Sequence, residues 1–184
     1  MAGITTVPIF VVVVATFITM VTDLWKFKIY NALTVPLLLS GLAYHAVVGG
    51  VAGLSGSLAG ALFGFAALLA FYVMGGMGAG DVKLMAAVGA WLGLPLTFAV
   101  FLASSLLAGL YALILVVAYG RVRETWLNVQ IGWLRLLALG RHLGADDRIE
   151  AEVKHPERGR RIIPFAAMVA LGLFGLLVCC RLLA

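Results

Sequence analysis

Residues 29–80 read IYNALTVPLLLSGLAYHAVVGGVAGLSGSLAGALFGFAALLAFYVMGGMGAG, a stretch that contains no Asp, Glu, Lys or Arg. A membrane-spanning helix needs about 20 apolar residues, so this stretch is long enough for two. Near its middle lie Gly49 and Gly50, and paired glycines favour a turn over a continuous helix. The stretch therefore predicts two membrane-spanning helices, at about residues 31–48 and 54–74, joined by a short turn.

The remainder of the chain has the same character, because residues 1–22, 84–120 and 162–180 also lack these four residue types. Hydrophobic residues make up 64% of the 184 and charged residues only 11%, with a mean hydropathy of +1.12. This composition excludes an ordinary soluble domain and indicates an integral membrane protein.

The uncharged stretches together predict six transmembrane helices and an all-α fold. Pro95 has no backbone N–H and predicts a turn inside the stretch 84–120. The remaining four helices are expected at about residues 4–22, 82–94, 97–119 and 163–182. In the helix predicted at 54–74, Gly56, Gly60 and Gly64 recur at every fourth residue, which predicts a face where another helix packs closely.

The basic residues of the chain gather on one side of this predicted bundle. Lys26 and Lys28 follow the first helix, Lys83 begins the fourth, and most of the others lie between residues 121 and 161. Because Lys and Arg prefer cytosolic loops, this side is predicted to be the cytosol, with both termini on the other side. Topology thus explains the net charge of +5 without a nucleic-acid partner.

We expect a single membrane domain over residues 1–184, with a cytosolic insertion at about 120–162. Residues 125–142, TWLNVQIGWLRLLALGRH, are too polar for a seventh span and predict an amphipathic helix at the membrane interface. The two cysteines, Cys179 and Cys180, are adjacent, and the three histidines lie in separate regions. Neither a metal site nor a cofactor site is therefore predicted.

Two acidic residues border the predicted spans, Asp23 at the end of the first helix and Asp81 at the start of the fourth. In the six-helix topology both lie at cytosolic helix ends and hence at equal depth. Two carboxyl groups that face one another can share a proton, so that one donates it while the other activates a water molecule. This is the chemistry of an aspartyl protease, which needs no metal. Gly78 and Gly80 would leave the backbone before Asp81 open to a peptide.

Other interpretations of the two aspartates remain open. Asp81 would be a suitable N-cap for its helix, and Asp23 would be an interfacial residue beside Lys26. A small proton-coupled membrane carrier could use the same two carboxylates to load and unload protons. Carriers often have internal repeats and helices broken at the bilayer midplane, and the sequence indicates neither. A scaffold without catalytic activity is a third interpretation.

The segment Gly78-Ala79-Gly80-Asp81, followed by Lys83, matches the GxGD motif of intramembrane aspartyl proteases. GMGAGDVKLMAA, residues 76–87, resembles the form of this motif in type IV prepilin peptidases. Asp23, followed by Lys26, Lys28, Ile29 and Asn31, is similar to the segment that carries the family's first aspartate, although Tyr30 replaces a proline found in many members. With RIIPFAAMVALG at residues 161–172, the resemblance covers almost the whole chain.

The resemblance implies that Asp23 and Asp81 are the catalytic pair of a prepilin peptidase. Such an enzyme would cleave the basic leader of a prepilin or pseudopilin-like protein at the cytosolic face of the prokaryotic inner membrane. The chain is similar to the compact form associated with Flp/Tad-type pili or archaeal flagellin-like filaments, which has no N-terminal cysteine-containing domain of the methyltransferase type. Whether it also methylates its product is left open. Membrane lipid and the protein substrate are the expected partners, and assembly into a homo-oligomer is left open.

Two further residues of these motifs have both a functional and a structural interpretation. Lys83 would steer a substrate carboxylate or the aspartate pair, but the preference of basic residues for the cytosolic side also explains it. Asn31 would bind substrate, but an N-cap of the second helix is an equally ordinary role.

Overall fold

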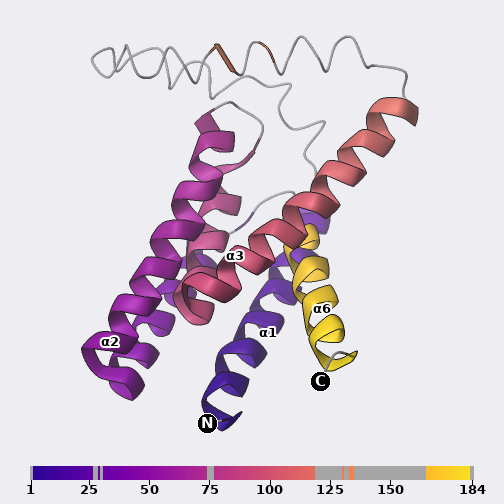
Figure 1. Ribbon diagram of the computed structural model, residues 1–184. Coiled ribbons are helices and arrows are strands. Elements are labelled where there is room, and N and C mark those ends of the chain that lie inside the picture. The colour runs from indigo at the N-terminus through magenta and orange to yellow at the C-terminus, as the bar shows by residue number, and fades with distance from the viewer. Residues whose placement is uncertain are drawn as a thin grey trace, which may run out of the picture.

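The computed structural model describes residues 2–26, 29, 31–73, 77–118, 130, 133–134 and 165–182. It is all-α over these residues, as predicted, with helices α1 (Ala2–Lys26), α2 (Asn31–Val73), α3 (Ala79–Ala118) and α6 (Phe165–Leu182) (Figure 1). α1, α2 and α3 are long and apolar enough to cross a membrane. The apolar part of α6, Phe165–Val178, is shorter. The interfacial helix predicted at residues 125–142 lies almost wholly outside the described residues.

α2 is bent back on itself at Gly50. As a straight helix its 43 residues would measure about 65 Å, twice the hydrocarbon thickness of a bilayer. The backbone of Gly50 has φ 58° and ψ −144°, a conformation that favours glycine. A Cβ atom on Gly53 would collide with the carbonyl oxygen of His45, although residues eight apart in a straight helix are about 12 Å apart. The turn predicted from the paired glycines is therefore present.

α3 also has a break, at Gly93, two residues before the proline that predicted it. Gly93 has φ 70° and ψ 175°, and Pro95 lacks the N–H that would bond to the carbonyl of Trp91. His45 Nε2 lies 2.9 Å from that carbonyl oxygen, so this nitrogen carries the proton and donates it. Ser57 Oγ donates to the neighbouring carbonyl of Ala90 at 2.5 Å. Side chains of α2 thus bond to carbonyls at the break in α3, where a membrane offers no water.

Glycines bring the backbones of α2 and α3 into contact. A Cβ atom on Gly60 would collide with the carbonyl of Gly89, and one on Gly64 would collide with the carbonyl of Met85. These two positions confirm the predicted packing face. Gly56 does not belong to this face, because it is exposed and a Cβ atom there would meet nothing within 4 Å.

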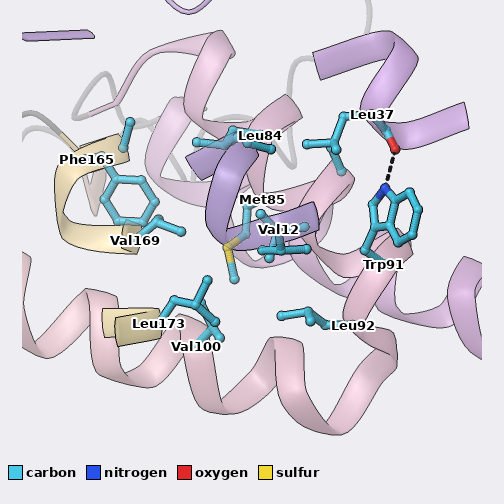
Figure 2. Packing of buried hydrophobic residues seen from close by; sticks show 14 of the residues in the cluster. Val12, Leu37, Leu84, Met85, Trp91, Leu92, Val100, Phe165, Val169 and Leu173 are labelled. Atoms are coloured by element: carbon cyan, nitrogen blue, oxygen red, sulfur yellow. Dashed lines mark hydrogen bonds between the residues drawn. The ribbon is translucent and has the colours of Figure 1, made fainter. Parts of the chain in front are cut away.

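The first half of α3, residues 79–92, lies at the centre of the molecule. Every residue from 84 to 92 is buried, with α2 covering one side. On the other side, Val12 of α1 and Phe165 and Val169 of α6 join Met85 in the apolar core (Figure 2). Trp91 closes the core against α2 by donating its Nε1–H to the carbonyl of Leu37 at 2.8 Å. The packing therefore encloses the start of α3, where Asp81 lies.

Candidate active site

Asp81 lies in the first turn of α3 and is only 5% exposed. Its Oδ2 accepts a hydrogen bond from the N–H of Gly78 at 3.2 Å, while its own N–H donates to the carbonyl of Gly78 at 3.2 Å. The carboxyl group therefore does cap the start of the helix, as one interpretation expected. Capping alone does not explain the burial, because a capping aspartate works equally well in solvent.

Asp23 lies near the end of α1 and is 4% exposed. The backbone N–H of Ala166, at the start of α6, interacts with this carboxyl group. Oδ2 of the same carboxyl group is buried and has no hydrogen-bond partner, a condition it shares, among the described side chains, only with the hydroxyl of Thr34. A buried acceptor without a partner is costly, and in native proteins it often marks a functional site.

The structure brings these two aspartates together. Asp23 comes from the last turns of α1 and Asp81 from the first turn of α3, and their carboxyl groups are near enough to interact electrostatically. Two buried carboxyl groups in this arrangement can share a proton and provide an acid and a base. Within the described part of the chain, no group of three His, Cys, Asp or Glu residues is placed to hold a metal ion.

The two glycines of the motif have different surroundings. A Cβ atom on Gly80 would lie 2.8 Å from Cβ of Ile29, so this glycine lets the segment before α2 pack against the start of α3. Gly78 is exposed, and a Cβ atom there would lie 3.3 Å from Asp81 Oδ2. Gly78 thus keeps the space beside the carboxyl group free, whereas Gly80 serves an internal contact.

Lys83 and Asn31 meet at the surface beside this site. Lys83 Nζ donates a hydrogen bond to Asn31 Oδ1 at 2.9 Å, which connects the second turn of α3 to the first residue of α2. Both side chains are exposed. Sequence reasoning identified each residue separately, but only the fold shows that they bond to each other.

Comparison with known proteins places the chain in a family. The model of the type IV leader peptidase family matches residues 10–113, a segment that contains Asp23, Asn31 and the whole GxGD motif. The chain belongs to the type IV leader peptidase family. The resemblance recognised in the sequence is thereby confirmed at the level of the family.

Curated relatives of this protein carry the name prepilin leader peptidase/N-methyltransferase. The protein from Aeromonas salmonicida (strain A449) is 39% identical over 110 residues, which is 56% of this chain and 36% of the relative. That from Aeromonas hydrophila is 42% identical over 103 residues, covering 52% and 34% of the two chains. That from Neisseria gonorrhoeae is 37% identical over 98 residues, covering 50% and 34%. The matches thus span about a third of each relative, and no solved structure matches the chain.

Sequence reasoning did not identify Ala166, whose backbone N–H interacts with Asp23. Ala166 belongs to the RIIPFAAMVALG segment, which predicted only the start of the last helix. An alanine carries no chemical signal in its side chain, and its N–H is available only because it lies in the first turn of α6.

Proposed function

We propose that this protein is an intramembrane aspartyl endopeptidase that removes the basic leader of a type IV prepilin or pseudopilin-like protein. The observation that carries the proposal is the meeting of two buried carboxyl groups, from α1 and α3, inside the segment that matches the leader peptidase family. The names of the curated relatives support the same class of substrate.

The two carboxyl groups would hydrolyse a peptide bond while sharing one proton. Asp23 Oδ2, which has no partner, takes a proton from water as the water oxygen attacks the scissile carbonyl carbon. Asp81, protonated at the start, gives its proton to the carbonyl oxygen, which produces a neutral gem-diol. When the C–N bond breaks, the leaving nitrogen takes the proton from Asp23, and Asp81 recovers one from a hydroxyl of the gem-diol. Both aspartates then have their starting protonation states.

We further propose that the chain crosses the bacterial inner membrane six times, with the aspartates at the cytosolic side. The bends at Gly50 and Gly93 divide α2 and α3 into four segments, which with α1 and α6 make six. The segment 79–92 is only about 21 Å long, but it is surrounded by other helices and need not reach across the lipid alone. A prepilin with its basic leader in the cytosol would present the scissile bond at this depth.

The carrier interpretation fits the structure less well. Broken helices do occur here, but the breaks at Gly50 and Gly93 lie far from the aspartates. Gly93 follows Asp81 by 12 residues, or about 18 Å of helix. In carriers the ion-binding groups typically lie at the breaks themselves.

The proposal is tested by co-expressing a prepilin from the same genome with the wild type, Asp23→Asn or Asp81→Asn. We expect the wild type to remove the leader and each variant to lose at least about a hundredfold in rate, because each removes an acid or base. Asparagine is also a good N-cap, so Asp81→Asn keeps the start of α3 intact. Asp147→Asn, in the predicted insertion, is the matched control. Mass spectrometry of the product identifies the new N-terminus and any added methyl group.

Full cleavage by either stable variant would refute the catalytic pair. If no variant and not even the wild type cleaves, proton uptake into vesicles becomes the deciding measurement. Uptake that depends on Asp23 and Asp81 without any cleavage would establish the carrier in place of the peptidase.

A further inference from the structure

Asp23 belongs to a row of buried residues on one face of α1. Val12, Thr16, Thr19 and Asp23 follow one another at intervals of three or four residues, the spacing that places side chains one above another on a helix. Each of the four is at most 4% exposed. Val12 joins Met85 in the apolar core, so this row faces the interior of the molecule (Figure 2).

The two hydroxyl groups of this row have the same kind of partner. Thr16 Oγ1 donates to the carbonyl of Val12, and Thr19 Oγ1 donates to the carbonyl of Ala15, each at 2.7 Å. In a regular helix the carbonyl four residues back already accepts the N–H of the same threonine, so the hydroxyl only adds a second bond to it. The helix therefore gains little stability from either hydroxyl group.

Of the two threonines, Thr19 has a carboxyl group on the next turn. Asp23 lies four residues after it, and a side chain of a helix leans toward the N-terminus, over the turn that precedes its own residue. The Asp23 carboxyl group therefore lies over Thr19, with Oδ2 buried and without a hydrogen-bond partner. Thr16 is seven residues from Asp23, or about 10 Å along the helix axis.

The proton of the Thr19 hydroxyl group can be redirected without moving the rest of the side chain. Rotation about the Cβ–Oγ1 bond turns it from one acceptor to another. A hydrogen bond to an ionised carboxylate is roughly twice as strong as one to a neutral carbonyl. An ionised Asp23 therefore competes successfully with the Ala15 carbonyl for this proton, whereas a neutral Asp23 does not.

We propose that Thr19 is a positioning residue of the catalytic pair. Its hydroxyl group turns from the Ala15 carbonyl to the Asp23 carboxylate, which keeps the negative charge on Asp23 and the shared proton on Asp81 before water attacks. The bond also fixes the rotation of the carboxylate, so that its other oxygen is held ready for the proton of the water. When Asp23 takes that proton, the hydroxyl group returns to Ala15. This inference rests on the proposed peptidase function.

The test removes the Thr19 hydroxyl group and leaves the shape of the side chain almost unchanged. Thr19→Val does this in the full-length chain. Thr16→Val is the matched control, because Thr16 is also buried, makes the same bond to its own helix and lies one turn further from Asp23. Thr19→Ser keeps the hydroxyl group and tests for rescue.

The readouts are kcat and KM for a prepilin and the midpoint of thermal unfolding. We expect Thr19→Val to lower kcat by about tenfold with KM within about twofold, because the hydroxyl group acts on Asp23 and not on substrate binding. Thr16→Val should keep kcat within about twofold of the wild type, and Thr19→Ser should recover it to within about threefold. The two valine variants should unfold at the same midpoint.

The inference would be overturned by wild-type kcat in Thr19→Val, by an equal loss of kcat in Thr16→Val, or by an equal loss in Thr19→Ser. A loss of kcat that follows the unfolding midpoint across the three variants would overturn it as well. A wild-type protein that cleaves no prepilin would refute the proposed function itself. Cleavage that is lost in Asp23→Asn but retained in Thr19→Val would refute the role of Thr19 only.

Discussion

The hydrogen bond between Lys83 and Asn31 holds a positively charged group beside the two aspartates. An ammonium group has three donors, and Asn31 Oδ1 takes one of them, which leaves two beside the site. Both residues are exposed, so loss of their bond should cost little folding free energy. The bond instead holds the positive charge near the start of α3, two residues after Asp81.

We therefore predict that Lys83→Met lowers kcat/KM for prepilin cleavage by about tenfold, with an unchanged unfolding midpoint. Asn31→Ala should lower it by about threefold, because the lysine remains but is no longer held in place. Steady-state kinetics on the purified variants provides the measurement. Wild-type kinetics in both would mean that Lys83 merely follows the preference of basic residues for the cytosolic side.

Among the elements, α2 and α3 form the most closely connected pair. The breaks in both helices were predictable, because Gly49–Gly50 and Pro95 disfavour a continuous helix by themselves. The side chains that bond at the break in α3 were not, because His45 and Ser57 come from another helix. The predicted glycine face fails at Gly56, where a Cβ atom would meet nothing within 4 Å, although the carbonyl oxygen of Gly56 lies near the break at Gly93.

The two kinds of glycine in α2 make a matched pair of substitutions. Gly60→Ala should lower the free energy of unfolding by at least about 2 kcal/mol, because the new methyl group would meet the backbone of α3 at Gly89 and Gly93. Gly56→Ala, in open space on the same helix, should leave it unchanged or raise it by up to about 1 kcal/mol. Unfolding in mixed micelles measures both. Equal stability of the two variants would contradict the close contact of the helices.

At the level of the whole molecule, the sequence predicted the aspartate pair but not its complete surroundings. Asp23 and Asp81 could be paired from charge placement, because so few charges border the uncharged stretches and both fall at helix ends on the same predicted side of the membrane. The contact with Ala166 could not, because it joins the first helix to the last and depends on how α6 packs against Val12 and Met85. Contacts between segments so distant in sequence depend on the packed fold and on no local pattern.

The six-span arrangement predicts that the two ends of the first half of α2 lie on opposite sides of the membrane. Ala32 and Gly49 are both exposed, and a side chain at Gly49 would meet nothing within 4 Å, so each position accepts a cysteine. With Cys179 and Cys180 replaced by serine, Ala32→Cys should react with a membrane-impermeant maleimide only from the cytosolic side, and Gly49→Cys only from the other. Labelling of inverted and right-side-out vesicles distinguishes the two sides. If both cysteines react from the same side, α2 does not cross the bilayer at this half, and the aspartates cannot be assigned to the cytosolic face from the positions of the basic residues.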